Sequence, residues 1–464
     1  MKNETIENKN YTFPLIVLTG LFFMWGFITC MNDILIPYLK KVFQLNYFQS
    51  MLVQFSFFGA YFIGSMVYFF ISKQVGDPIN KIGYKNGILI GLILSAIGSA
   101  LFYPAAVLSS YGFFLTALFI VGIGFTLLQI AANPYVAILG DEKTASSRLN
   151  LTQAFNSLGT TIAPLIGGYL IFHYFANEAG AGSVKIPYIV FTIVFILLAL
   201  LIKFSRLPRF FNESDVEKGA GALKYPHLIL GMIAIFMYVG SEVSIGSFMI
   251  SFLGLEDIAG LSSKDASVFV AFYWGGLMIG RFMGAVSLSN MKLLRKRLIM
   301  LIIPLIAFVI IYLNKGQEIA FIYTIFLILN YFAFVLGKSL PGRTLMIFAL
   351  SAVILLFVTF FTHGKVAMWS LIGIGIFNSI MWSNIFTLSI AGLGKYTSQG
   401  SSLLVMMIVG GALLPLAQGA IADVVGVHHS FILPIIAYLY IAFFGAWGYK
   451  YNCLLYTSPS PRDS

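Results

Sequence analysis

The sequence predicts an all-α protein that crosses a membrane many times. Of its 464 residues, 59% are hydrophobic and only 10% are charged, whereas soluble domains carry about 25% charged residues. Apolar runs of about 20 residues recur along the chain, and a helix of that length crosses the core of a bilayer. The alternation typical of a β-barrel is not visible. The net charge of +11 therefore belongs to loops, not to a nucleic-acid surface.

Fourteen spans are expected, and their even number places both termini on one side of the membrane. The termini and the loops on their side carry twenty Lys and Arg, whereas the opposite loops carry six. By the positive-inside rule both termini are expected in the cytoplasm. The expected spans are 13–39, 48–73, 85–107, 111–139, 146–174, 186–206, 226–253, 266–290, 297–313, 318–337, 343–361, 364–391, 398–424 and 430–450.

The first six spans form one half, residues 1–206, and a polar linker at 207–225 separates it from a related half at 226–452. Gly59 and Gly64 recur 216 positions later, at Gly275 and Gly280. Further along, the offset of the matching residues is 251 positions, as in Asn133/Asn384, Gly159/Gly410, Pro164/Pro415 and Gly168/Gly419. The offset grows by about two spans, so we expect an inserted helical hairpin near 297–337 outside the repeat.

The ends of the chain add little to the fold. Residues 1–12 are polar and have no cleavable signal pattern. The two cysteines, Cys30 and Cys453, argue against a disulfide framework. Residues 453–464 have neither helical nor membrane character and resemble translated adapter sequence, so we expect this tail to be non-native.

Two carboxylates lie well inside apolar spans, although the chain has 17 acidic residues. Asp33 is in the first span, where burying a charge costs roughly 3 kcal/mol on insertion scales. Glu242 is in the first span of the second half. A carboxylate in such a place is expected to carry a proton, bind an ion or bind a polar solute. For Glu242 the alternative is a hydrogen bond to a hydroxyl or amide across the bundle.

Amide and aromatic side chains recur at helical spacing in several spans, which places each pair on one helix face. Such amides either line a polar cavity or tie helices together by hydrogen bonds. Asn133 and Pro134 are expected to be structural, because the proline frees a carbonyl that the amide can satisfy. The expected cavity residues are Asn32, Gln129, Gln153, Asn156, Asn378 and Trp382.

The remaining polar residues suggest no further chemistry. Arg281 is expected to be a structural loop clamp at the cytoplasmic end of its span. His173, His363, His428 and His429 fall near outer span ends, where solvation is the default interpretation. The sequence shows no motif of a hydrolase, no phosphate-binding loop and no metal-ligand cluster, so we expect neither an enzyme, a bound metal nor a cofactor.

Three segments carry a family resemblance. Residues 32–37, 129–135 and 148–159 resemble motifs of the fucose–galactose–glucose proton symporters, and two six-span halves with a basic linker resemble the plan of the major facilitator superfamily. Gln129 and Glu242 depart from the fucose permease pattern, which has Glu at the first position and Gln at the second. The chain is therefore more similar to the glucose/galactose branch.

The resemblance implies a proton-coupled hexose importer of a bacterial inner membrane, with sugar and proton as its partners and a monomeric state. Asp33 matches the proton-coupling carboxylate of the family, and Glu242 is a second candidate for that role. Gln153, Asn156 and Trp382 match sugar-cavity positions. Two alternatives remain, a proton-coupled exporter of apolar compounds and a transporter-derived sugar sensor. The amide cluster disfavours the exporter, and the short linker disfavours the sensor.

Overall fold

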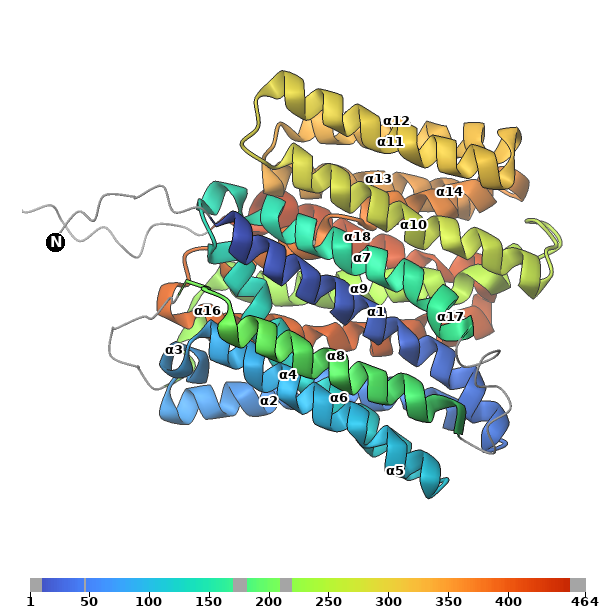
Figure 1. Ribbon diagram of the computed structural model, residues 1–464. Helices are drawn as coiled ribbons and strands as arrows, with labels where there is room; N and C mark the ends of the chain where they lie inside the picture. Colours follow the sequence, from blue (N-terminus) through green and yellow to red (C-terminus); the bar gives the residue numbers. More distant parts are fainter. Residues whose placement is uncertain (1–10, 46, 170–181, 209–218, 451–464) are drawn as a thin grey trace, which may run out of the picture.

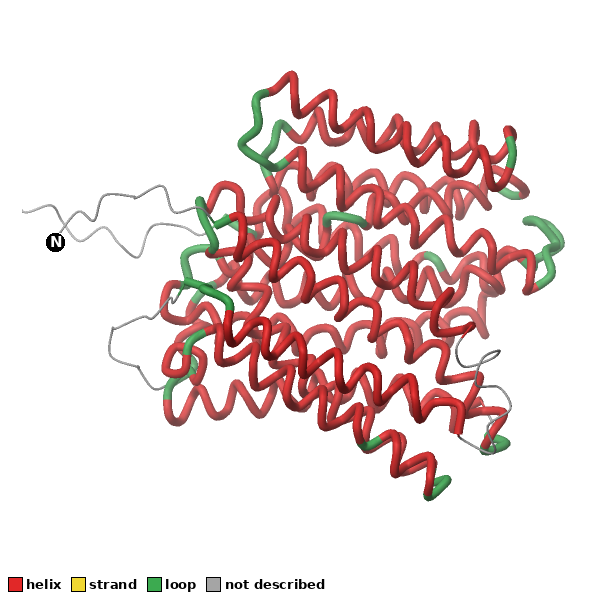
Figure 2. The backbone as a smooth tube through the Cα atoms, viewed as in Figure 1, coloured by secondary structure: helices red, strands yellow, loops and turns green. Residues whose placement is uncertain are grey.

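The fold is a bundle of long helices that run side by side, with short connections between them (Figures 1 and 2). The computed structural model describes residues 11–45, 47–169, 182–208 and 219–450, and no strand occurs in these ranges. Part of the linker and the whole tail, 453–464, lie outside these residues. We call the end of the bundle where the first helix begins the N-terminal face, and the opposite end the far face.

Within its described residues, the first half forms six membrane-length rods. Leu101, between the fourth and fifth helices, keeps helical angles (φ −66°, ψ −15°), so these two helices form one rod. The helices of this half are α1 (Thr12–Val42), α2 (Tyr47–Val75), the short α3 (Pro78–Ile82), α4 (Tyr84–Ala100), α5 (Phe102–Val107), α6 (Tyr111–Ile138), α7 (Ala145–Tyr169) and α8 (Lys185–Phe204).

The second half contains eight rods, two of which are interrupted. One breaks between α14 and α15, and the other breaks between α16 and α17 at the short helical turn Met407–Val409. The helices are α9 (Pro226–Leu253), α10 (Ser263–Ser287), α11 (Leu293–Lys315), α12 (Gln317–Gly337), α13 (Pro341–Phe361), α14 (Gly364–Asn378), α15 (Met381–Ile390), α16 (Thr397–Met406), α17 (Gly410–Ser430) and α18 (Ile432–Phe443).

Helix packing repeats between the halves. α1 packs against α7 as α9 packs against α17, and α2 packs against α6 as α10 packs against α14. A Cβ atom on Gly159 would lie 2.2 Å from the carbonyl oxygen of Phe23, and one on Gly410 would lie 2.2 Å from that of Phe236. Such distances exclude any side chain, so glycine permits both crossings. These two glycines are one of the pairs by which the sequence indicates the repeat.

The hairpin of α11 and α12 lies at the edge of the bundle. α4 packs on α6 and α8 as α13 packs on α14 and α18, so α13 is the counterpart of α4 and the hairpin has none. α11 exposes apolar side chains along its length, among them Leu294, Leu305 and Leu313. The Nζ atom of Lys296 anchors the hairpin by donating to the carbonyl oxygens of Ser287 and Ser289, at 2.8 and 2.9 Å.

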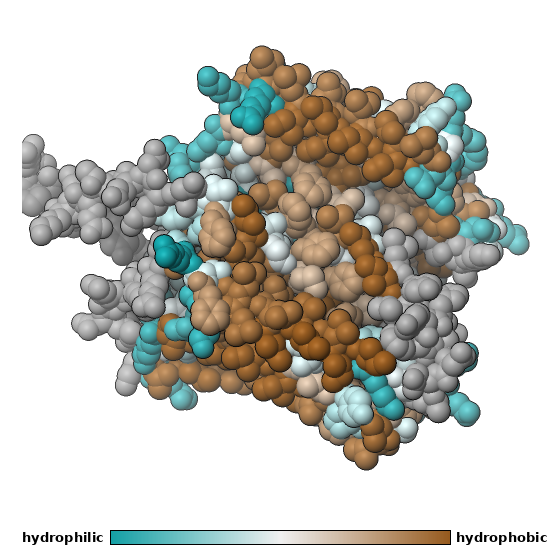
Figure 3. All heavy atoms as spheres, in the orientation of Figure 1, coloured by the Kyte–Doolittle hydropathy of each residue, from teal (hydrophilic) through white to brown (hydrophobic). Residues whose placement is uncertain are grey.

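The membrane-crossing character of the bundle follows from length and composition. Twelve segments in the described ranges are long and apolar enough to cross a membrane. The two remaining expected spans correspond to α7 and to the segment Ile432–Gly448. α7 is more polar than the twelve segments, and Ile432–Gly448 is shorter than they are. On the face drawn in Figure 3, hydrophobic side chains cover the flanks and hydrophilic ones gather at the two ends, as a bilayer requires.

Candidate functional site

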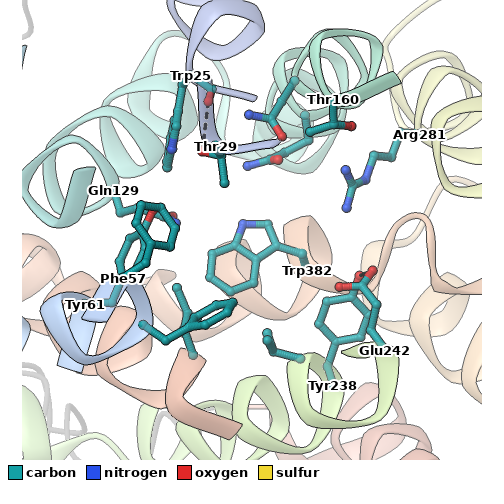
Figure 4. A pocket seen from close by; sticks show the side chains of 15 residues that line it. Trp25, Thr29, Phe57, Tyr61, Gln129, Thr160, Tyr238, Glu242, Arg281 and Trp382 are labelled. Atoms are coloured by element: carbon teal, nitrogen blue, oxygen red, sulfur yellow. Dashed lines mark hydrogen bonds between the residues drawn. The ribbon is translucent and has the colours of Figure 1, made fainter. Parts of the chain in front are cut away.

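A central cavity of about 210 Å³ lies between the two halves, near the breaks in the second half (Figure 4). It is smaller than the roughly 300–1,000 Å³ of pockets for drug-sized ligands, so it suits a small solute. Its walls come from α1, α2, α6 and α7 of the first half and from α9, α10, α15 and the turn before α17. The lining residues are Trp25, Thr29, Phe57, Phe58, Tyr61, Gln129, Gln153, Asn156, Thr160, Tyr238, Val239, Glu242, Arg281, Trp382 and Ile408.

Gln129 projects into the cavity from α6, and its amide is held from one turn along the same helix. The Nδ2 atom of Asn133 donates to its Oε1 atom at 2.8 Å, and the hydroxyl of Tyr61 lies within hydrogen-bonding reach of its side chain. Asn133 is completely buried inside α6, which continues through Pro134. Its structural partner is therefore the Gln129 side chain, whereas the sequence predicted a carbonyl freed by Pro134.

α7 contributes a row of polar side chains at helical spacing. Asn156 donates from Nδ2 to the carbonyl oxygen of Phe22 at 2.9 Å, which ties α7 to α1 while the residue still lines the cavity. Gln153 is almost fully buried at 7% exposure and faces the same space. Thr160 continues the row. Because Asn156 is tied to the backbone, Gln153 is the freer amide of the pair.

Glu242 projects from α9 into the cavity, and two tyrosines bond it, one at the carboxylate and one at the backbone. The hydroxyl of Tyr238, one turn earlier, donates to its Oε1 atom at 2.6 Å. The hydroxyl of Tyr273 donates to its backbone carbonyl at 3.0 Å. The carboxylate therefore has a fixed direction and keeps acceptor capacity for a donor in the cavity.

Asn378 lies behind this wall and does not line the cavity. Its Nδ2 atom donates to the hydroxyl of Tyr273 at 2.8 Å, and its Oδ1 atom accepts from the hydroxyl of Tyr438 at 2.7 Å. Asn378 is completely buried, and both ends of its amide are engaged. The structure thus places it as a support for the tyrosines around Glu242, where the sequence predicted direct substrate contact.

Arg281 lines the cavity from the C-terminal third of α10, whereas the sequence predicted only a structural loop clamp at this end of the span. Its Nε atom donates to the carbonyl oxygen of Ser379 at 3.2 Å, and its guanidinium also donates to the hydroxyl of Ser157 on α7. Figure 4 shows its guanidinium on the same side of the cavity as Glu242. The ion pairs within 4.0 Å among the described residues lie elsewhere. Arg281 therefore connects the two halves at the cavity.

Trp382, in the first turn of α15, presents its indole in the centre of the view in Figure 4. The ring is 7% exposed and stacks on Phe386 at a centroid distance of 6.0 Å. Its Nε1 atom is buried, and among the described residues it has no hydrogen-bond partner. A buried donor without a partner costs free energy, so this N–H is suited to bind a polar group of a solute.

The side chains of Asn32 and Asp33 lie outside the part of the chain that the structure describes. Their backbone belongs to α1. Trp25 and Thr29 of this helix line the cavity, and Asp33 is the next residue in the same four-residue spacing. The sequence analysis did not predict that Trp25, Thr29, Tyr61 and Tyr238 line the cavity. For Trp25 and Thr29, the four-residue spacing from Asp33 would have indicated the same helix face.

Hydrogen bonds between the halves close the N-terminal face. Ser146 and Thr387 share a bond of 2.6 Å between their hydroxyl oxygens, Asn150 donates to Asn384 at 3.2 Å, and Gln399 donates to the hydroxyl of Ser72 at 2.9 Å. Toward the far face, the described residues show only a 4.0 Å contact from a hydroxyl to a sulfur between the halves. The cavity is therefore sealed at one end.

A larger cavity of about 1010 Å³ lies at the sealed end. Both Ser146 and Thr387 line it, together with loop residues such as Glu142, Asn290 and Tyr449. The same pair of hydroxyls therefore belongs to the seal and to this vestibule.

The chain is similar to known transporters over nearly its whole length. Residues 16–337 match the family model described as Major Facilitator Superfamily. A glucose/galactose transporter of Brucella abortus is 48% identical over 457 residues, covering 97% of each chain. An L-fucose-proton symporter of Escherichia coli is 30% identical, covering 94% of this chain and 93% of that one.

Solved structures show the same architecture. A crystal structure of the Escherichia coli fucose:proton symporter FucP superposes with a TM-score of 0.75 at 28% identity, covering 95% of this chain and 99% of that one. A second structure of FucP, in the outward conformation, gives a TM-score of 0.74 at the same identity and coverage.

Proposed function

Because the chain belongs to the Major Facilitator Superfamily, we propose that it imports a hexose together with a proton by alternating access. In this mechanism one central site is exposed to the two sides of the membrane in turn. The names of the relatives support the substrate class, since they include a glucose/galactose transporter and an L-fucose-proton symporter. The higher identity of the former favours glucose or galactose over fucose.

The observation that carries this proposal is the chemistry of the central cavity. Amides of Gln129, Gln153 and Asn156 face a carboxylate and an indole across a space of about 210 Å³. Amides and carboxylates bind hydroxyl groups as donors and acceptors, and a hexose is dense in hydroxyls. Trp382 adds a flat apolar face for the sugar ring and a buried N–H that lacks a partner. An exporter of apolar compounds would not need these polar groups.

Asp33 is proposed as the proton-coupling carboxylate. Its position continues the series Trp25, Thr29 along α1, and both of these line the cavity. Protonation would remove a charge from an apolar helix and so allow closure around the sugar. One proton moving down about 100 mV yields roughly 2.3 kcal/mol, which supports about 50-fold accumulation of sugar at 1.36 kcal/mol per tenfold. Glu242 is a second titratable candidate, held by Tyr238.

The sealed end is proposed to face the cytoplasm. The N-terminal face carries most of the Lys and Arg of the loops, and basic loops remain inside. We place the chain in the inner membrane of a bacterium with both termini in the cytoplasm. The structure then corresponds to the state that receives sugar and proton from outside, in agreement with the likeness to FucP in the outward conformation.

Counterflow in proteoliposomes tests the substrate class. Vesicles loaded with unlabelled hexose are diluted into labelled glucose, galactose, fucose or mannose, and glucose or galactose is expected to exchange fastest. Trp382→Phe keeps an aromatic face but removes the N–H, so affinity should fall about 5-fold, the value of one hydrogen bond of about 1 kcal/mol. Exchange of none of these hexoses by the wild-type protein would refute the proposal.

A further inference from the structure

A second polar cluster lies at the far face, away from the central cavity. Two connections of the second half and the end of α17 meet there and bring Asp257, His363 and His428 together. Asp257 follows α9, His363 directly precedes α14, and His428 lies near the end of α17. One ligand atom from each lies within 4.8 Å of the other two. The sequence predicted no metal-ligand cluster, because the first and last of these residues, Asp257 and His428, are more than a hundred and sixty positions apart.

The hydrogen bonds of the two histidines leave donor atoms for a cation. The ring of His428 approaches the carbonyl oxygen of Thr359 through Nε2 at 2.7 Å. A carbonyl can only accept, so Nε2 carries the proton and Nδ1 keeps a free lone pair. A backbone carbonyl often fixes the tautomer of a metal-binding histidine in this way. The Nδ1 atom of His363 lies 2.9 Å from Oδ2 of Asp257, where a metal ion can take the place of the shared proton.

The backbone around the cluster holds its three segments in place. The N–H of Gly364, next to His363, donates to the carbonyl oxygen of Asp257 at 3.0 Å. α17 is kinked at Gly426, whose φ of 84° favours glycine, and this kink lies two residues before His428. Phe252 packs edge-on against the His428 ring at 5.4 Å. The cluster is therefore built on a fixed frame.

The surroundings suit a cation with open coordination positions. His428 is buried, whereas the side chains of His363 and Asp257 are 62% and 55% exposed, which leaves room for water ligands. Glu256 adds an exposed negative charge next to Asp257. Lys365, the nearest cation along the chain from His363, is engaged by Glu318 at 3.1 Å.

We propose that Asp257, His363 and His428 bind a divalent transition-metal ion of the Zn²⁺ type at the far face. Two imidazoles and one carboxylate are ligands that Zn²⁺ accepts, and a three-ligand site keeps a position for water. The bound ion would link the connection after α9 to the start of α14 and to the end of α17. It would thus restrain the far end of the helix that carries Glu242.

Zn²⁺ titration of the purified full-length protein, carrying no polyhistidine tag, tests this site by calorimetry. The wild type should bind one Zn²⁺ saturably, and Zn²⁺ should raise its Tm, since a ligand of the folded state stabilises it. Asp257→Asn and His363→Gln alter exposed side chains, and each should lower the affinity at least about 10-fold, as loss of metal-site groups does. Affinity should also fall at acidic pH, because protons compete for the ligands.

His429→Gln is the matched control, because His429 is exposed and stacks on His428 but lies outside the cluster. This variant should bind Zn²⁺ like the wild type. Hexose counterflow by all variants verifies that they fold, independently of the metal. Absence of saturable binding in the wild type would overturn the proposal, and so would unchanged affinity in both ligand variants.

Discussion

At the scale of single residues, each half orients its main cavity group from one helical turn away. Asn133 donates to Gln129 on α6, and Tyr238 donates to Glu242 on α9. Both pairs have the four-residue spacing that places side chains on one helix face. The cavity groups are therefore positioned before a solute arrives, which lowers the entropy cost of binding.

Asn133→Ala should weaken sugar binding, although Asn133 itself does not line the cavity. The substitution removes the donor that holds the Gln129 amide, and one such bond contributes about 1 kcal/mol, so the Kd should rise about 5-fold. Proton-driven accumulation should persist, because neither residue titrates. Equilibrium binding of labelled hexose measures the effect, and Gln129→Ala is the comparison with the larger expected loss. An unchanged Kd would show that Asn133 does not position Gln129.

Asp33→Asn should abolish uphill uptake while sparing exchange. Asparagine mimics a permanently protonated carboxyl, so the protein can still bind sugar and carry it across in exchange. Net uptake also needs the proton to be released and the empty, deprotonated protein to return, and this step is blocked. Uptake driven by an imposed pH gradient should fall to the level of empty vesicles, and counterflow should remain within about 3-fold of wild type, or roughly 0.7 kcal/mol. Accumulation that persists in this variant would refute the coupling role of Asp33.

At the scale of helices, close crossings and interrupted rods locate the cavity. The α1–α7 and α9–α17 crossings depend on Gly159 and Gly410, and the breaks after Asn378 and Met406 lie next to lining residues Trp382 and Ile408. Broken helices at membrane depth are tolerated where they are buried in protein or line a cavity. The backbone groups freed at the two helix breaks therefore lie beside the cavity.

Gly159→Ala should destabilise the first half. Its Cβ would lie 2.2 Å from a carbonyl oxygen of α1, so the two helices must separate, and such overpacking costs about 1–3 kcal/mol. The Tm of the purified protein in detergent should fall by several degrees. Gly20→Ala, on α1 with open space around its Cβ, is the matched control; alanine is the better helix former, so this variant should not lower the Tm. Equal Tm values for both variants would contradict the crossing argument.

Asp77 caps α3 in the connection after α2 and makes stability depend on pH. Burial raises the pKa of its carboxyl from 3.8 to about 6, although hydrogen bonds from Tyr68 and Ile79 lower it in part. Between these pKa values the folded protein holds a proton that the unfolded chain releases. The stabilising contribution is therefore full below about pH 4 and is lost as the pH rises through about 6.

Asp77→Asn should remove this dependence, because asparagine can still accept the bond from the N–H of Ile79, which is 3.0 Å long in the wild type. The Tm of the wild type should fall relative to that of the variant between about pH 4 and 6, and the difference should be constant above about pH 7. Parallel Tm curves through the acidic range would show that the carboxyl does not keep its proton in the folded state.

At the scale of the whole molecule, two helical bundles meet around one cavity that is sealed at the N-terminal face. The hairpin of α11 and α12 lies outside this arrangement and supplies none of the lining residues. The seal includes single hydrogen bonds between hydroxyl and amide groups. Each contributes about 1 kcal/mol net, and helix contacts between the halves, such as those of α16 with α2 and α6, add to them.

A Ser146→Cys, Thr387→Cys double variant should lock the molecule with the N-terminal face closed. The two hydroxyl oxygens are 2.6 Å apart, so an oxidant should join the cysteines. Uptake should then fall at least about 10-fold, equivalent to about 1.4 kcal/mol, and recover with reductant, while sugar binding persists. Each single variant is the control for oxidation of native Cys30. Full uptake with a complete cross-link would show that this seal need not open.

Much of the fold follows from the sequence alone, because span length and hydropathy are local properties. Helices lie at all fourteen expected spans in the described residues, twelve of them long and apolar enough to cross a membrane, and the hairpin near 297–337 is formed by α11 and α12. The offset of 251 positions between Gly159 and Gly410 matches two equivalent helix crossings. Five residues singled out for cavity or coupling roles, Gln129, Gln153, Asn156, Glu242 and Trp382, line the central cavity. Helical spacing indicates such faces because 3.6 residues make one turn.

Only the tertiary structure decided which polar groups meet. Arg281 turns into the cavity and Asn378 turns away from it, because the rotation of each helix depends on the packing of its neighbours and not on its own period. Asp257, His363 and His428 come from three segments far apart in the chain, and local spacing does not predict that such segments meet. Sequence period determines the faces of each helix, whereas packing between helices determines what those faces contact.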